Sequence, residues 1–361
     1  MTLTQAIKSS PYHFFFLVVE NFLDISLPEI PNFTSVSKKK LTYKNSGKLL
    51  ADKNIQKNIK SFANPVIVPF KPSAKIEKIC QKNHWLLAAP GAKNNRLLED
   101  KIKFYQQCQK AKLPLIDSLI LPFNQKNFSK AQQAYGSNLV IQSHFGWAGN
   151  STYNFDNYTS AKKHIPKNML VKFSPYIQGF SVLNNCCQTK KGLLQSPPAL
   201  QFTGIPTLTS NPFATVGRQW PSLLHKSQLR QIKKITQNFS KKILQPLNYL
   251  GFFGLDFLVT PQKIYLLECN PRLTASFAFY TYMEQKAGLT PLFYHHLAQF
   301  IPLDYEFNLK KEQSRFDNPN LIGSQITKRN PSGTISQKIE DFKIITNKVQ
   351  TINEEHLKKF K

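Results

Sequence analysis

Few features of the sequence would place the protein in a membrane or outside the cell. The longest apolar run of the 361 residues covers positions 14–19 and ends at Glu20, whereas a membrane helix needs roughly 20 apolar residues. Lys8 is the only positive charge ahead of this run, and Pro11 interrupts the approach to it. A secretory signal has a different pattern. We therefore expect a cytoplasmic protein without a membrane partner.

Cysteine is also scarce. The five cysteines form neither a CxxC pair nor an even, regularly spaced set, so the sequence favours neither disulfides nor a zinc site. We expect five reduced thiols. Cys186 and Cys187 are adjacent, and in a strand they would point to opposite faces.

Acidic residues and arginines are few beside the lysines. The chain has 20 acidic and 48 basic residues, a net charge of +28, and only six arginines. Lysine releases counterions from phosphate, but base-edge and bidentate phosphate recognition favour arginine. Since the lysines are spread along the chain, a solvated lysine surface is the favoured interpretation, and a nucleic-acid partner is allowed but not favoured. The densest block, Lys38 to Lys60, is either a polyanion contact or a basic loop.

No GxGxxG motif is present, yet the first part of the chain has the alternation of an α/β domain. Apolar strands are predicted at 13–19 and 65–70, a helix is indicated by the spacing of Ile76, Ile79 and Cys80, and a short apolar stretch follows at 85–89. This order predicts a small N-terminal domain with a parallel sheet over residues 1–96.

The rest of the chain predicts a mixed α+β region. We expect one helix from Leu97 to its stop at Pro114, and a long amphipathic helix that ends at Pro246. A Pro-rich surface stretch is expected from Ser196 to Pro221. Two further helices are predicted, one ended by Gly288 and the next started by Pro291, and the lysine-rich residues 304–361 predict a short β segment and a helical tail. Strands are expected at 119–121, 139–143, 170–173, 176–184, 251–259 and 264–272.

Two segments carry residues suited to chemistry. In the first, residues 145–152 form a small-residue loop whose amides and hydroxyls could wrap a phosphate, although an ordinary hairpin turn explains the loop equally well. In the second, Asp256 interrupts an apolar strand, while Glu268, Asn270 and Arg272 alternate along one face of the next strand. Two carboxylates and an amide suit Mg²⁺, and a nearby arginine suits a polyphosphate. The alternative is a buried salt bridge of Asp256 or Glu268 with Arg272.

The metal hypothesis makes a geometric prediction. Asp256 and Glu268 are an even number of residues apart. They face each other across an antiparallel pair only if the turn has an odd number of residues, most simply 261–263 with Thr260 opposite Ile264. A register with Asp256 opposite Leu267 would contradict the metal site.

The E-x-N-P-R run at residues 268–272, after an acidic residue in the preceding strand, resembles the metal-binding end of the ATP-grasp superfamily. Residues 273–276 further resemble the branch that includes tyramine-glutamate ligase and the pyrrolysine-pathway ligase. Upstream, Glu99-Asp100-Lys101 resembles the start of the nucleotide-binding subdomain. The resemblance spans about 97–301. It implies an ATP-grasp domain at 97–303, with a nucleotide-binding subdomain at about 97–173 and a metal and catalytic subdomain at about 174–303. A pre-ATP-grasp domain precedes it, and an extension follows at 304–361.

The resemblance also implies the roles of residues. Asp256, Glu268 and Asn270 would bind Mg²⁺ or Mn²⁺, and Arg272 with Asn270 would be catalytic. Two positions depart from the family pattern: Gln142 stands where a lysine is usual, and Ser174 where a glutamate is usual, so that Lys101 remains as the phosphate-directed cation. ATP would be bound by Lys101, Gln142, Gly146, Gly149, Ser151, Thr152, Pro175, Tyr176 and Ile177.

The implied activity is an ATP- and Mg²⁺-dependent ligase that joins a small carboxylate to an amine through an acyl-phosphate. One alternative is the activation of bicarbonate, as in carbamoyl phosphate synthetases and biotin carboxylases. Another is a non-catalytic protein that binds nucleotide or nucleic acid. A homodimer is allowed.

Overall fold

A computed structural model describes residues 1–19, 27, 30–37, 45–146 and 149–327, and Met1–Lys328 form one compact unit. The first lysines of the basic block and the expected helical tail lie outside these ranges. None of the helices in the described ranges has the length and apolarity that a membrane crossing requires.

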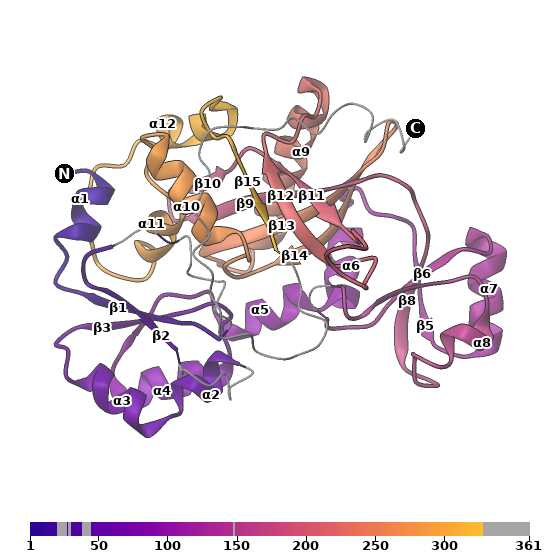
Figure 1. Ribbon diagram of the computed structural model, residues 1–361, viewed down its shortest axis with the longest axis horizontal. Coiled ribbons are helices and arrows are strands. Elements are labelled where there is room, and N and C mark those ends of the chain that lie inside the picture. Colours follow the sequence, from indigo (N-terminus) through magenta and orange to yellow (C-terminus); the bar gives the residue numbers. More distant parts are fainter. Residues whose placement is uncertain (20–26, 28–29, 38–44, 147–148, 328–361) are drawn as a thin grey trace. The chain divides into compact units, whose positions relative to one another are not determined.

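The N-terminal region contains the expected parallel sheet (Figure 1), in the strand order β2-β1-β3-β4. Helices α2, α3 and α4 pack on one face of this sheet, and α10 and α11 pack on the other. Burial on both faces explains why β3 is apolar throughout and why β1 is apolar after His13. The elements are β1 (His13–Leu17), β2 (Phe33–Val36), β3 (Pro65–Pro69), β4 (Leu86–Leu87), α1 (Leu3–Lys8), α2 (Ser46–Leu50), α3 (Lys53–Lys60), α4 (Ala74–Asn83), α10 (Phe277–Lys286) and α11 (Leu292–Leu297).

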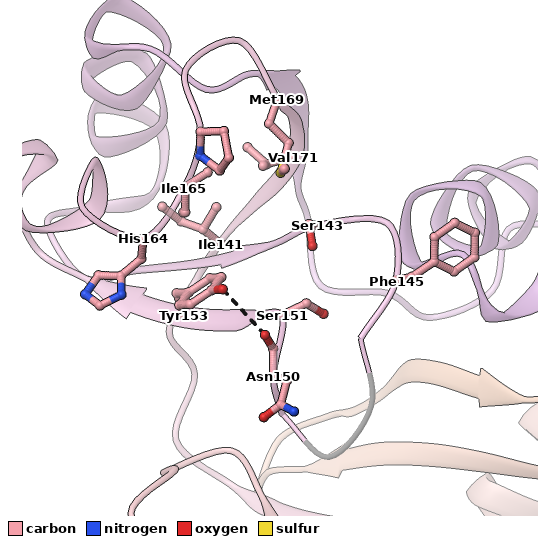
Figure 2. A pocket seen from close by; sticks show the side chains of 11 residues that line it. Ile141, Ser143, Phe145, Asn150, Ser151, Tyr153, His164, Ile165, Met169 and Val171 are labelled. Atoms are coloured by element: carbon pink, nitrogen blue, oxygen red, sulfur yellow. Dashed lines mark hydrogen bonds between the residues drawn. The ribbon is translucent and has the colours of Figure 1, made fainter. Parts of the chain in front are cut away.

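A small antiparallel sheet has the order β5-β8-β6-β7. Its strands are β5 (Leu119–Pro122), β6 (Leu139–Gln142), β7 (Thr152–Phe155) and β8 (Leu170–Pro175), and its helices are α7 (Gln125–Tyr135) and α8 (Tyr158–Ala161). Ile141, Val171 and Phe173 belong to the apolar core on one face. Beside that core lies a cavity of about 150 Å³, to which Tyr153 and His164 also contribute (Figure 2).

The third sheet is the largest and has the order β14-β13-β9-β11-β12-β15, with β10 also paired to β9. Cys186 and Cys187 in β9 face two different apolar cores, as the alternation of a strand requires, and all five cysteines are free and buried. Both expectations about the cysteines are therefore confirmed. The elements are β9 (Phe180–Thr189), β10 (Gly192–Gln195), β11 (Ala199–Thr203), β12 (Thr215–Trp220), β13 (Gly251–Val259), β14 (Ile264–Asn270), β15 (Gly323–Ile326) and α9 (Lys226–Phe239), which continues as a π-helix over Ser240–Leu244.

The prediction of a Pro-rich surface stretch from Ser196 to Pro221 was wrong. This segment supplies β11 and β12 to the large sheet, and Ser196 and Trp220 are buried. The prolines stand in the connections that flank the strands, where the missing N–H costs no ladder hydrogen bond. A high proline content therefore did not exclude two strands here.

The single helix predicted from Leu97 is also corrected. Two helices, α5 (Ala92–Glu99) and α6 (Lys101–Lys110), meet at Asp100. The Asp100 carboxylate accepts hydrogen bonds from the amides of Ile102 and Lys103, both at 3.1 Å, and so caps the start of α6. This break places Glu99 and Lys101 on either side of a helix junction.

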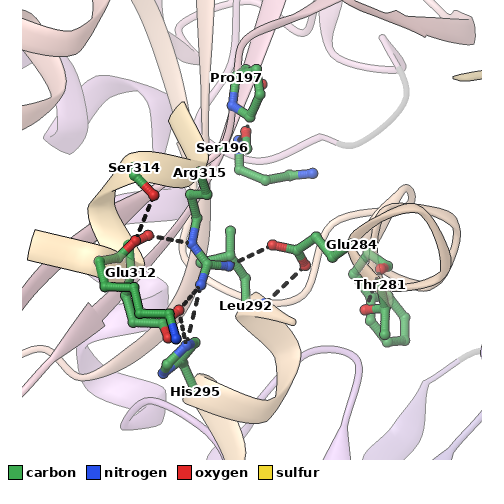
Figure 3. Close-up of polar contacts among 12 residues, drawn as sticks. Ser196, Pro197, Thr281, Glu284, Leu292, His295, Glu312, Ser314 and Arg315 are labelled. Atoms are coloured by element: carbon green, nitrogen blue, oxygen red, sulfur yellow. Dashed lines mark hydrogen bonds and ion pairs between the residues drawn. The ribbon is translucent and has the colours of Figure 1, made fainter. Parts of the chain in front are cut away.

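Residues 309–326 contain a short helix and a strand that joins the large sheet. Strand β15 pairs with β12, and Arg315, which follows α12 (Leu309–Gln313), is fully buried (Figure 3). The Arg315 Nη1 donates to the Glu284 Oε1 at 2.6 Å, its Nε donates to the Glu312 carbonyl at 2.8 Å, and its Nη2 contacts the Glu312 carboxylate. This network connects α10 to α12.

Candidate functional site

Asp256 in β13 lies directly opposite Glu268 in β14. The predicted three-residue turn was wrong, because Val259 pairs with Ile264 and four residues therefore make the turn. The register shifts between Asp256 and Phe257, where Leu267 is the extra residue of a β-bulge. The bulge restores the facing pair that an even turn alone would have removed, and the contradicting register with Asp256 opposite Leu267 does not occur.

The Asp256 carboxylate is held by two amides. Its Oδ1 accepts from the Gln201 Nε2 at 2.7 Å, and its Oδ2 accepts from the Asn270 Nδ2 at 2.8 Å. Burial raises the pKa of Asp256, while the charges of Arg218 and Lys101 and these hydrogen bonds partly oppose the shift. The sequence did not identify Gln201, because it comes from β11, within the segment assigned to the surface.

Lys101 and Glu268 form an ion pair across the site. Lys101 opens α6, its side chain is about nine-tenths buried, and its ammonium contacts the Glu268 carboxylate. Desolvation lowers the pKa of Lys101 to about 8, although the charges of Asp256 and Glu99 oppose the shift. The structure thus brings the predicted phosphate cation and the predicted metal ligands into one cluster.

Arg272 pairs with Glu99 rather than with Asp256 or Glu268. Its Nε donates to the Glu99 Oε1 at 3.1 Å, and its Nη2 donates to the Asn270 Oδ1 at 2.9 Å. The guanidinium also lies 5.0 Å from the centre of the Phe70 ring. Glu99 was noted in the sequence only as part of a motif, and its role as the counterion of Arg272 was missed.

The small-residue loop connects β6 to β7. The Gln142 Nε2 donates to the Thr152 Oγ1 at 3.0 Å, and the Thr152 amide donates to the Gly149 carbonyl at 3.1 Å. Gly149 has a φ of +81°, and a Cβ there would lie 2.8 Å from the Phe213 carbonyl carbon. Glycine is therefore required for the loop to approach the connection between β11 and β12.

Two further loop residues lie close together. A Cβ on Gly146 would lie 1.8 Å from the Ser151 Oγ, so only glycine permits this approach. The Ser151 hydroxyl is buried and has no hydrogen-bond partner within the described ranges. The Trp147 and Ala148 positions of the loop lie outside those ranges.

The predicted adenine-binding segment follows β8. Pro175 ends this strand, and the Tyr176 amide donates to the Asn138 carbonyl at 3.1 Å. The Tyr176 side chain is exposed, and Ile177 lies in the connection to β9. The segment thus joins the small sheet to the large one.

The residues present suit a hard cation in their chemistry. Asp256 and Glu268 supply carboxylates and Asn270 supplies an amide, although no cluster of three His, Cys, Asp or Glu occurs within the described ranges. Asn270 now points its Nδ2 toward Asp256 and its Oδ1 toward Arg272. To coordinate a cation beside Asp256, the amide of Asn270 would have to rotate.

The cavity in Figure 2 is not part of this cluster. Ile141 and Val171 line it, and they lie on the apolar face of the small sheet. Gln142 and the residue opposite it, Lys172, alternate with them and point to the other face.

Comparisons with known proteins identify the class. The family model of the ATP-grasp domain matches residues 98–276, which include the Asp256 and Glu268 pair. A search of curated proteins found no significant match in sequence. The chain belongs to the ATP-grasp superfamily, and its mixed α/β architecture confirms the expected fold.

Solved structures share this fold. N5-carboxyaminoimidazole synthetase from Staphylococcus aureus, complexed with ADP, has a TM-score of 0.59 and 12% identity, over 83% of this chain and 81% of that one. A biotin carboxylase from Campylobacter jejuni, in an ATP complex, has a TM-score of 0.61 and 16% identity, over 87% and 70% of the two chains. The corresponding synthase from Aspergillus clavatus, with ADP and 5-aminoimidazole ribonucleotide, has a TM-score of 0.57 and 11% identity, over 81% and 78%.

Proposed function

We propose that the protein is an ATP-dependent ligase that joins a carboxylate to an amine through an acyl-phosphate. The observation that carries this proposal is the cluster in which Asp256, Glu268 and Asn270 meet the buried cations Lys101 and Arg272 at the β13–β14 edge of the large sheet. Two carboxylates with an amide fit a metal, and the buried cations fit the phosphates that the metal would neutralise.

The nucleotide-binding part of the proposal uses the two segments that join the sheets. The hinge carrying Pro175, Tyr176 and Ile177 would contact adenine, and Lys101 would contact the α- or β-phosphate. The loop from Gly146 to Thr152, with Gly149 and Ser151, would cover the γ-phosphate and exclude water. Gln142 hydrogen bonds to Thr152 at 3.0 Å and so positions the end of this loop.

The chemical part assigns the remaining residues. Asp256, Glu268 and Asn270 would hold Mg²⁺ or Mn²⁺, which when bound supplies neutralisation of the phosphate charge. A carboxylate oxygen of the substrate attacks the γ-phosphorus and ADP leaves. The amine then attacks the carbonyl carbon, phosphate leaves, and the amine proton passes to solvent. Arg272, which contacts Glu99 and Phe70, would hold the carboxylate and then the acyl-phosphate.

Bicarbonate activation is the second candidate. The names of two structural neighbours, a carboxyaminoimidazole synthetase and a biotin carboxylase, favour it. Bicarbonate would take the place of the carboxylate substrate, and the same residues would serve.

A screen for ADP release tests both candidates. Amino acids and amines are supplied in pairs with ATP and Mg²⁺, and bicarbonate is supplied in a separate arm. We expect release that is stimulated by one carboxylate and amine pair, accompanied by an amide in the mass spectrum, and abolished in Glu268→Gln. Glu306→Gln, at an exposed carboxylate outside the cluster, is the matched control and should be active. Stimulation by bicarbonate alone would select the second candidate, and no stimulation by any substrate would refute both.

A further inference from the structure

Lys172 is a buried cation of the small sheet, on the strand next to the one that leads into the candidate phosphate loop. It lies in β8 directly opposite Gln142 of β6. Residues directly opposite in an antiparallel pair have their side chains on the same face. Val171 and Phe173 point into the apolar core on the other face. Lys172 therefore shares its face with Gln142, the last residue of β6 before the loop.

The surroundings of Lys172 lack an anion. Its side chain is 8% exposed, and its ammonium lies 5.5 Å from the centre of the Tyr105 ring. Within the described ranges no carboxylate lies at ion-pair distance from this ammonium, and no hydrogen bond to it is found. A buried ammonium without a counterion is unfavourable, so an anion that reached Lys172 would be bound favourably.

A second buried cation, Lys101, lies near Lys172 and makes the binding of an anion there more favourable. Desolvation, together with the positive charge of Lys101, lowers the pKa of Lys172 to about 7. The two lysines come from different elements, since Lys101 opens α6 and Lys172 lies in β8, against which α6 packs. Lys101 has Glu268 as its partner, whereas Lys172 has none among the described residues. An anion with more than one charged oxygen would satisfy the repelling pair.

We propose that Lys172 binds the phosphates of the nucleotide and so supplies, from the neighbouring strand, the cation that the uncharged Gln142 cannot supply. The proposal rests on the nucleotide site of the proposed function. It assigns to Lys172 a role in binding a nucleoside diphosphate or triphosphate, with no role in holding adenine.

Calorimetry with Mg²⁺ and ADP, and separately with adenosine, tests the proposal. A charge-assisted hydrogen bond is worth a factor of about 10 to 100 in affinity. Lys172→Met should therefore bind ADP about 10- to 100-fold more weakly and bind adenosine as the wild type does. Lys103→Met, at an exposed lysine of α6, is the matched control and should bind ADP normally. Unchanged ADP affinity in Lys172→Met, or an equal loss for adenosine, would overturn the proposal.

Transposing the charge gives an independent test. In the double variant with Gln142→Lys and Lys172→Gln the cation returns to the same face from the facing strand, so ADP affinity should recover most of what Lys172→Gln alone loses. Failure to recover would count against the proposal.

The melting temperature without nucleotide separates a binding lysine from a structural one. Lys172→Met removes a buried charge that lacks an anionic partner among the described residues, so the free protein should melt at a higher temperature than the wild type. A lower melting temperature would identify Lys172 as a structural residue and overturn the proposal. A wild-type protein that binds neither ADP nor adenosine would instead refute the nucleotide site itself.

Discussion

The contact between Glu99 and Arg272 gives a quantitative prediction. The Glu99 side chain is 11% exposed and that of Arg272 is 7% exposed, and the Arg272 Nε donates to the Glu99 Oε1 at 3.1 Å. A hydrogen bond between charged groups contributes about 1.5–3 kcal/mol, and leaving one member of a buried pair alone costs up to about 5 kcal/mol. Glu99→Gln keeps an oxygen acceptor but removes the charge. We therefore expect the free energy of unfolding to fall by about 2–3 kcal/mol at pH 7.

The stabilisation by Glu99 should also depend on pH, and the direction of this dependence follows from the pKa of its carboxyl group. Burial by itself raises the pKa of Glu99, but the charges of Arg272 and Lys71 outweigh it and hold the pKa below its ordinary value of 4.5. The ionised carboxylate therefore stabilises the fold above pH 4.5, and this contribution is lost as the pH falls through the lowered pKa. The difference between the wild type and Glu99→Gln should be full at pH 7 and should shrink below about pH 4.5.

Urea denaturation at several pH values measures this difference. Lys71→Met is the matched control. Lys71 contacts the other oxygen of Glu99, but its side chain is half exposed, so its loss should cost at most about 1 kcal/mol. A loss below about 0.5 kcal/mol for Glu99→Gln at pH 7, or the same loss well below pH 4.5, would refute the reasoning.

Three other predictions follow from the structure. Arg315→Met should cost about 3–5 kcal/mol of stability, measured by urea denaturation, because it strands the buried Glu284 carboxylate, and adding Glu284→Gln should recover part of the loss. The ADP affinity of the wild type should fall as the pH rises above about 7, by up to tenfold per pH unit, because Lys172 loses its proton there in the protein without nucleotide. Calorimetry of Lys172→Met over the same pH range separates this dependence from the one that Lys101 causes. Gly149→Ala should make residues 145–152 more sensitive to limited proteolysis, because alanine at a φ of +81° costs about 1–2 kcal/mol and its Cβ meets the connection between β11 and β12.

The sequence predicted the elements whose pattern is local. The apolar runs that became β1, β3, β13 and β14 were visible from alternation and length, and the facing of Asp256 and Glu268 was expected. The bulge at Leu267 that produces this facing was not predicted, because a bulge has no fixed residue signature and depends on how two strands pair.

Contacts between distant segments could not be predicted. The pairing of Gln201 with Asp256, and of Glu99 with Arg272, joins residues that are 55 and 173 positions apart. Lys172 appeared as a single lysine in an apolar strand, and its place opposite Gln142 required the register of β6 and β8. The break at Asp100 was also missed, although it is a local feature, because an aspartate followed by a helical pattern is a recognisable helix cap.

The position of β15 has a consequence for biosynthesis. Until residues 323–326 emerge from the ribosome, β12 has one side without a neighbouring strand, although β12 itself was made about a hundred residues earlier. An open strand edge is a template for pairing with another chain. During translation the nascent chain therefore has an unpaired, aggregation-prone edge at β12 until residues 323–326 have been made. Truncated chains that end before Gly323 would keep this edge unpaired permanently.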